Sequence, residues 1–96
     1  MSETPEQKAQ RLFDEEEGRP PAWWWLSFAS ADQSLGVVIV LAPGFFHAVR
    51  RTHHLGINPG GEVQGMPLPK RMPDSVVEEY QDRLLSRAEV EEAGFA

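Results

Sequence analysis

AWWWLSFASADQSLGVVIVLA, residues 22–42, carries the strongest secondary-structure signal in this chain. Aromatic and β-branched residues dominate segments 22–30 and 35–42, and such residues favour strands. The polar run SADQS between the two segments supplies turn residues. The stretch therefore predicts a β-hairpin with strands at 22–30 and 35–42.

Both faces of the predicted hairpin are apolar. Successive strand side chains point to opposite faces, so Trp24, Leu26 and Phe28 share one face and Trp23 and Trp25 share the other. We assign Trp24 to packing with Leu26 and Phe28. Trp23 and Trp25 must be covered by a terminal helix, a second subunit or a ligand. Self-association through their face is expected, because monomers rarely expose large apolar patches.

Helix signals lie on both sides of the hairpin. Thr4 and Gln7 predict a capping box at the start of an N-terminal helix, and Gly18 predicts its end. A central helix is predicted at 43–55, with Gly56 as a left-handed cap after its last turn.

The remainder of the chain predicts a turn, a short strand and a last helix. Pro-Gly in the run INPGG favours a type II turn, and a short strand follows at 61–66. Ser75 and Glu78 predict a capping box for the last helix. A second box, Ser86 and Glu89, either restarts that helix or extends it.

This order of elements predicts one α+β domain with a small antiparallel sheet of about three strands, the hairpin plus the strand at 61–66. Residues 1–21 form an acidic helical arm, 22–73 the α+β core and 74–96 an acidic C-terminal helix. The central and terminal helices are expected to cover the sheet through apolar side chains. These are Phe45, Val49 and Leu55 of the central helix, Leu12 and Phe13 of the first, and Val77, Tyr80 and Leu84 of the last.

Composition places the chain among ordinary globular proteins, with 96 residues, 41% hydrophobic and 25% charged. The absence of cysteine excludes disulfides and thiolate metal sites. The sequence has no apolar run suited to a signal peptide, nor one near the roughly 20 residues of a membrane helix. We therefore expect a soluble, cytoplasmic protein without membrane contact.

The net charge of −6 argues against general nucleic-acid binding, but it is unevenly distributed. Residues 1–21 hold six acids and three bases, and residues 74–96 hold seven acids and two bases. Residues 22–73 hold two acids and four bases, together with all three histidines. An anion site is therefore expected in the centre of the chain.

His47, Arg50, Arg51 and His54 fall on one side of the predicted central helix, at spacings i, i+3, i+4 and i+7. Two arginines on one helix can hold phosphate or carboxylate oxygens in a forked geometry. The alternative is an ordinary solvated helix face, or one that pairs with the acidic terminal helices.

The loop GINPGGE, residues 56–62, is the most distinctive local feature. The amides of Gly60 and Gly61 can approach a ligand closely and form an anion nest, with Asn58 and Glu62 as neighbouring polar groups. The alternative is a helix-to-strand turn whose glycines serve backbone geometry.

Neither a metal site nor a catalytic site is indicated. His47, His53, His54 and Glu62 lack the i, i+4 histidine spacing of helical zinc sites. Serines and histidines occur without a nucleophile elbow or an orienting carboxylate. We expect no cofactor, and a non-enzymatic protein is favoured over an enzyme.

Residues 25–69 resemble small uncharacterised proteins of bacteria and their phages. The resemblance lies in a W-x-S-F-A strand, an L-G-x-x-I-V strand, an F-x-x-A helix and the turn LGINPGGEV at 55–63. It implies a compact fold shared with those proteins and brings no established activity.

The leading functional hypothesis is a binder of a small anionic ligand, such as a nucleotide signal, acting as a phage-type sponge against host immunity and forming a homo-oligomer. The alternatives are a protein–protein inhibitor or adaptor whose acidic helices face a basic partner, and a small phosphoester hydrolase. The predicted ligand-binding residues are Trp23, Trp25, His47, Arg50, Arg51, His54, Asn58, Gly60, Gly61 and Glu62.

Overall fold

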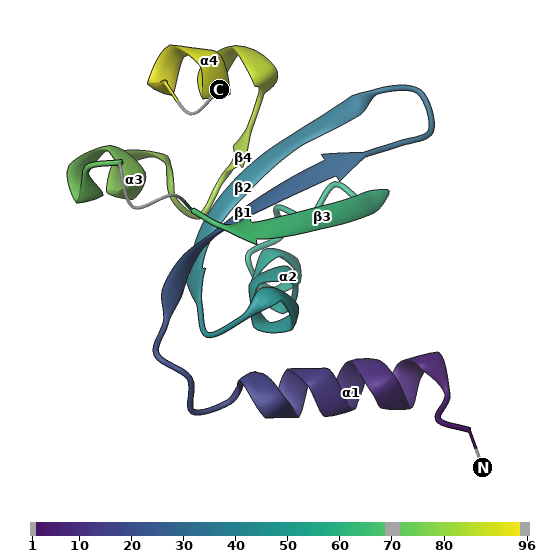
Figure 1. The fold of residues 1–96 in the computed structure, drawn as a ribbon. Helices are drawn as coiled ribbons and strands as arrows, with labels where there is room; N and C mark the ends of the chain where they lie inside the picture. The colour runs from purple at the N-terminus through teal and green to yellow at the C-terminus, as the bar shows by residue number, and fades with distance from the viewer. Residues whose placement is uncertain (1, 69–71, 95–96) are drawn as a thin grey trace.

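The computed structural model describes residues 2–68 and 72–94, and within them it contains four helices and one antiparallel sheet of four strands. The strand order is β3-β1-β2-β4 (Figure 1). The elements are α1 (Pro5–Glu16), β1 (Ala22–Ala29), β2 (Ser34–Ala42), α2 (Phe45–His54), β3 (Glu62–Pro67), α3 (Asp74–Tyr80), β4 (Leu84–Leu85) and α4 (Arg87–Ala93). Pro69, Lys70 and Arg71, at the end of the predicted core, lie outside the described residues.

The α+β class is confirmed, and the sheet has one strand more than the sequence predicted. The additional strand, β4, pairs with β2 at Val37 and Val38. It has two residues, too few to produce the alternation by which a strand is recognised in a sequence.

Face one of the sheet, formed by Trp24, Leu26, Phe28, Val38 and Val40, is covered by α2. In the pairing of β1 with β2, Trp24 lies opposite Val40 and Leu26 lies opposite Val38, so these side chains lie on the same side of the sheet. The predicted packing role of Trp24 is confirmed. Its indole N–H is buried and has no hydrogen-bond partner among the described residues.

Helix α2 contributes Ala48, Phe45 and Val49 to face one. Leu55 was expected beside them, but it follows the last turn of the helix and is 41% exposed. The helix begins at Phe45 instead of Pro43, because Gly44 occupies the N-cap in an extended conformation.

Face two, formed by Trp23, Trp25, Val37 and Ile39, is covered by the C-terminal part of the chain. The buried side chains of Val77, Leu85 and Val90 pack on Val37 and Ile39, and the partly buried Trp23 and Trp25 pack against the same cluster. Figure 1 shows α3 and α4 on the side of the sheet opposite α2. A terminal segment therefore covers the two tryptophans, which was one of the three predicted possibilities.

The C-terminal segment is two short helices instead of one long helix. Ser86 and Glu89 form the predicted capping box, and a new helix, α4, begins there after β4. The box predicted at Ser75 and Glu78 is wrong: the N-cap of α3 is Pro73, which places Ser75 inside the first turn.

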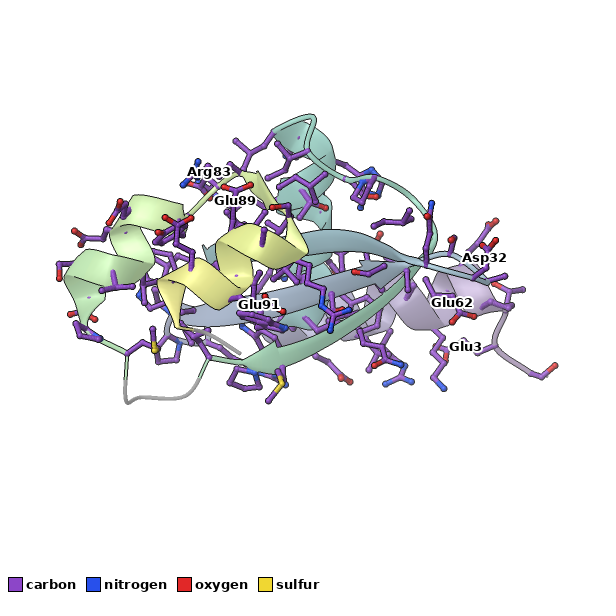
Figure 2. The ribbon with its side chains drawn as sticks, turned by 90° about the horizontal axis from the view of Figure 1, so that it is seen from above. Glu3, Asp32, Glu62, Arg83, Glu89 and Glu91 are labelled. Carbon is purple, nitrogen blue, oxygen red and sulfur yellow. The ribbon has the colours of Figure 1, made fainter. Side chains whose placement is uncertain are left out.

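Between the two helices, the chain forms a turn at Asp82, whose φ of 59° is in the left-handed region. Leu84, expected to cover the sheet, is 39% exposed, while its neighbour Leu85 is fully buried. Adjacent strand residues point to opposite sides, so only one of the two leucines can face the core. Seen from above, α4 lies across the sheet with Glu89 near Arg83, 3.6 Å from Oε2 to Nη1 (Figure 2).

Helix α1 packs on α2, which lies between α1 and the sheet (Figure 1). Its predicted capping box is present, with Thr4 and Gln7 exchanging hydrogen bonds between side chain and backbone N–H. Phe13 was expected to offer an apolar surface to the sheet, but α2 lies between them and Phe13 packs on α2 instead. In the described part of the chain, no helix is long and apolar enough to cross a membrane.

Candidate functional site

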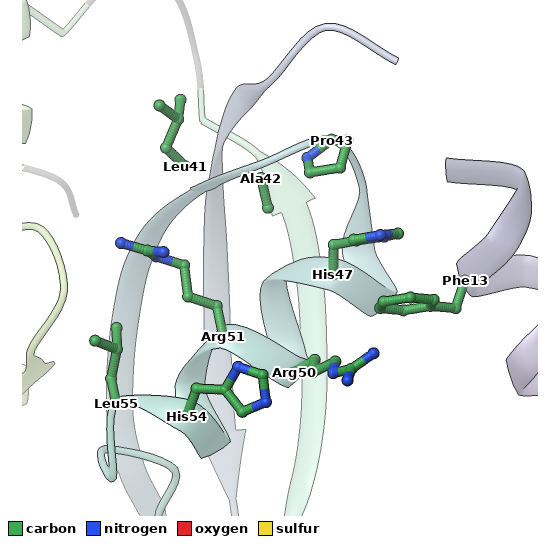
Figure 3. Close-up of a pocket in the computed structure, with 9 residues that line it drawn as sticks. All are labelled: Phe13, Leu41, Ala42, Pro43, His47, Arg50, Arg51, His54 and Leu55. Atoms are coloured by element: carbon green, nitrogen blue, oxygen red, sulfur yellow. The ribbon is translucent and has the colours of Figure 1, made fainter. Parts of the chain in front are cut away.

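The cationic side of α2 borders a groove of about 330 Å³, which we name the α2 groove (Figure 3). Figure 3 shows Arg50 directed toward Phe13 of α1, and Arg51 directed away from it toward Leu41 at the end of β2. The lining residues are Phe13, Leu41, Ala42, Pro43, His47, Arg50, Arg51, His54 and Leu55.

The N-terminus of α2 is capped by Glu16, a residue of another helix. Gly44 provides no side-chain cap, and the first backbone N–H groups of a helix need acceptors. One carboxylate oxygen of Glu16 accepts from the N–H of Phe46, and the other accepts from the N–H of His47, each at 2.9 Å. The second oxygen also lies 2.9 Å from Nδ1 of His47.

Glu16 is charged in this position although it is only 5% exposed. Burial alone would raise its pKa, but hydrogen bonds from the backbone N–H groups of His47 and Phe46 and from the His47 ring outweigh burial and lower the pKa. The same contacts hold α1 in place, and α1 in turn places Phe13 as a wall of the α2 groove.

Phe13 lies between His47 and Arg50 (Figure 3). Its ring stacks on His47 with centroids 3.6 Å apart and planes 11° apart. The Cζ atom of Arg50 is 5.0 Å from the ring centroid, a cation–π distance. Since both neighbours are in place, the Phe13 ring does not offer an open face on which a base could stack.

The basic side chains of the α2 groove differ in whether a carboxylate of the chain already pairs with them. Arg51 pairs with Asp82 through two contacts of 3.3 Å. No carboxylate in residues 2–68 and 72–94 pairs with Arg50 or His54. Arg50 is therefore the permanent charge most available to an external anion.

The glycine loop has a structural role, which was the alternative to the predicted anion nest. Nδ2 of Asn58 donates to Oγ1 of buried Thr52 at 2.9 Å and lies 3.3 Å from Nε2 of His53. Oδ1 of Asn58 accepts from the N–H of Gly60 at 2.8 Å. Of the two amides expected to bind an anion, that of Gly60 is thus already hydrogen-bonded within the loop, and Asn58 fastens the loop to the end of α2.

Gly61 brings the loop against β1. A Cβ atom at this position would lie 2.4 Å from the carbonyl oxygen of Ala29, and its φ is +75°. Only glycine combines that conformation with that close approach. Glu62 then begins β3 opposite Ala29, so it belongs to the sheet and does not line the α2 groove.

The two candidate tryptophans lie on face two, while the α2 groove lies on the α2 side of the sheet. Trp23 borders a cavity of about 470 Å³ beside Met72 and Val77, and Trp25 borders one of about 190 Å³ beside Gln64 and Met66. The ten predicted ligand-binding residues therefore occupy three separate places. The structure groups His47, Arg50, Arg51 and His54 at one groove.

Sequence reasoning missed Phe13, Glu16, Leu41 and Leu55 as contributors to this site. The sequence contains one relevant signal: the central helix starts after Pro43-Gly44, without a Ser, Thr, Asp or Asn at the N-cap. A helix start of this kind needs an acceptor from elsewhere in the chain. The acidic run at 14–17 is where that acceptor comes from.

The chain matches no protein family model, no curated protein and no solved structure. Within the described residues, no three or more His, Asp or Glu side chains are placed to hold a metal ion. The function is therefore inferred from the chemistry of the α2 groove.

Proposed function

We propose that this chain is a non-enzymatic binding protein whose α2 groove holds an anionic ligand. The observation that supports this proposal is Arg50, an exposed guanidinium at the groove without a carboxylate partner among the described residues. His54 and the partly neutralised Arg51 add donors beside it. In a chain with a net charge of −6, this cluster of cations is the natural place for an anion to associate.

The ligand group that fits this lining is a phosphate or a carboxylate, because guanidinium groups bind planar or tetrahedral oxyanions through paired hydrogen bonds. Exposed Leu41 and Leu55 border the same groove and favour a ligand with an aliphatic part next to its charge. The nucleotide signal suggested by the sequence belongs to this class of anions. Its sequestration is one use of such a groove.

Thermal unfolding with added anions tests the proposal. The panel contains pyrophosphate, linear and cyclic nucleotides, and a dicarboxylate. A ligand at ten times its Kd stabilises the folded state by about 1.4 kcal/mol. For a domain of this size that corresponds to a rise in Tm of several degrees.

Arg50→Ala should abolish the rise in Tm, because it removes the unpaired guanidinium. Arg87→Ala is the matched control, since Arg87 is 86% exposed on α4 and does not line the groove. The proposal fails if no anion in the panel raises the Tm at millimolar concentration. It also fails if Arg50→Ala and Arg87→Ala respond alike.

A further inference from the structure

One wall of the α2 groove is a strand edge. The N–H of Leu68 donates to the carbonyl oxygen of Trp23 at 2.9 Å, so Trp23 directs its backbone groups toward β3. Hydrogen bonding alternates along an antiparallel strand, and Leu41 is the register partner of Trp23 on β2. The N–H and C=O of Leu41 therefore point away from β1, to the outer edge of β2.

This edge is occupied along part of β2 and open at its end. Strand β4 pairs with Val37 and Val38, and the N–H of Asp82 donates to the carbonyl oxygen of Ile39 at 2.9 Å. Beyond Ile39, no backbone hydrogen bond in the described residues reaches the outward groups of Leu41. Leu41 itself is 43% exposed and lines the α2 groove.

A strand added at this edge would have two chemically different sides. Side chains on its face-one side would lie toward α2, whose Arg51 is directed toward Leu41 and whose Arg50 and His54 line the same groove. Side chains on the other side would lie beside the exposed side chain of Leu41, which has the same orientation as Trp23 and Ile39. Acidic residues suit the first side and apolar residues the second.

The geometry points to an extended acidic peptide as the ligand: a partner segment in which acidic and apolar residues alternate, adding a short strand at Leu41 with its carboxylates toward α2. This inference rests on the proposed anion-binding function of the α2 groove and names the class of its ligand. Main-chain hydrogen bonds at the open edge supply affinity, and the alternation of side chains supplies specificity.

The test measures fluorescence anisotropy with labelled short peptides and the full chain. The parent peptide alternates Glu and Val, and a control peptide alternates Lys and Val. Two further peptides carry backbone N-methyl groups, one on every Glu and the other on every Val. Because N–H groups of a strand point alternately to its two edges, only one methylated set can remove the donors that face β2.

We expect the Glu–Val peptide to bind at least about tenfold more tightly than the Lys–Val peptide, and one methylated peptide to lose about tenfold while the other binds like the parent. Arg50→Ala should weaken the parent peptide, while Arg87→Ala should not. The methylated peptides test strand pairing on the unaltered protein, so the result does not depend on how any variant folds.

The outcomes separate this inference from the proposed function. If both methylated peptides bind like the parent, or if the parent survives Arg50→Ala, the inference is overturned. If pyrophosphate binds in an Arg50-dependent way and the acidic peptide does not bind, the inference fails and the anion-binding function stands. If neither pyrophosphate nor the acidic peptide binds, both the inference and the proposed anion-binding function are overturned.

Discussion

Glu16, the last residue of α1, accepts hydrogen bonds from His47 at two points, the backbone N–H and ring Nδ1, across 31 residues of chain. The pair caps α2 and docks α1 at the same time. Because Phe13 is one turn earlier on α1, this contact also positions the aromatic wall of the α2 groove. The first helix is thus joined to the site through one carboxylate.

Replacing Glu16 with alanine should destabilise the protein. The change removes the acceptor of two helix N–H groups, and loss of a helix cap costs about 0.5–2 kcal/mol. Urea unfolding measures this difference in free energy. The neighbouring exposed Glu17→Ala is the control and should change the free energy of unfolding little; equal effects of the two changes would contradict the capping role.

Gly44→Ala should be destabilising only while Glu16 is present. A Cβ atom at position 44 would lie 2.2 Å from Cδ of Glu16, whereas the φ of Gly44, −173°, is accessible to alanine. In the Glu16→Ala background the collision disappears. A double-mutant cycle should therefore give a coupling energy of about 0.5–3 kcal/mol, as for residues in contact. Additive effects would show that the two residues do not touch.

The stability contributed by Glu16 should depend on pH. Its pKa is lower in the folded protein than its ordinary value of 4.5, so the folded state holds its proton more weakly than the unfolded state. The contribution is therefore complete above about pH 4.5 and is lost as the pH falls through the folded pKa. The difference in unfolding free energy between wild type and Glu16→Gln should shrink on acidification. A constant difference down to about pH 3 would contradict this assignment.

Leu85→Ala should strongly destabilise the protein by removing packing on face two, whereas Leu84→Ala should change the stability little. Leu85 is fully buried against Val37, Ile39 and Val77, and removing such a side chain costs about 2–5 kcal/mol. Leu84 is 39% exposed, and its loss should cost nearer 0.5 kcal/mol, as surface substitutions do. Chemical denaturation of the two variants compares adjacent positions of one strand. A larger effect at Leu84 would mean that β4 has the opposite orientation.

Asp82→Asn should strengthen anion binding at the α2 groove. Asparagine tolerates the left-handed conformation of Asp82, so the turn is retained while Arg51 loses its competing carboxylate. Exposed ion pairs are worth roughly 0.2–1 kcal/mol, which predicts an affinity gain of up to about fivefold for pyrophosphate. Titration calorimetry measures it, with Asp32→Asn in the hairpin loop as control. An unchanged or weaker affinity would place the anion away from Arg51.

Features that depend on neighbours in sequence could be predicted from the sequence. The two faces of the hairpin follow from the period-two alternation of strands, so the separation of Trp24 from Trp23 and Trp25 was correct. The capping boxes at Thr4 and Ser86 each lie within one helical turn. The cationic side of α2 follows from helical spacing in the same way. Its four residues, His47, Arg50, Arg51 and His54, line one groove as predicted from that spacing.

The parts that could not be predicted depend on groups that meet only after folding. The sequence predicted that the backbone N–H of Gly60 is available to a ligand. In the folded loop the side chain of Asn58 accepts a hydrogen bond from that N–H and also donates one to Thr52. The predicted ligand site combined Trp23 and Trp25 with Arg50 and Arg51, but the tryptophans lie on face two and the arginines on the α2 side of the sheet.

The sequence by itself determined the hairpin, its two apolar faces and the cationic side of α2, because strand and helix periodicity depends on the order of neighbouring residues. The tertiary structure determined which segment covers Trp23 and Trp25, which carboxylate caps α2, and which charge stays available at the groove. Those outcomes depend on long-range packing and on hydrogen bonds such as that between Glu16 and His47, which no local pattern encodes.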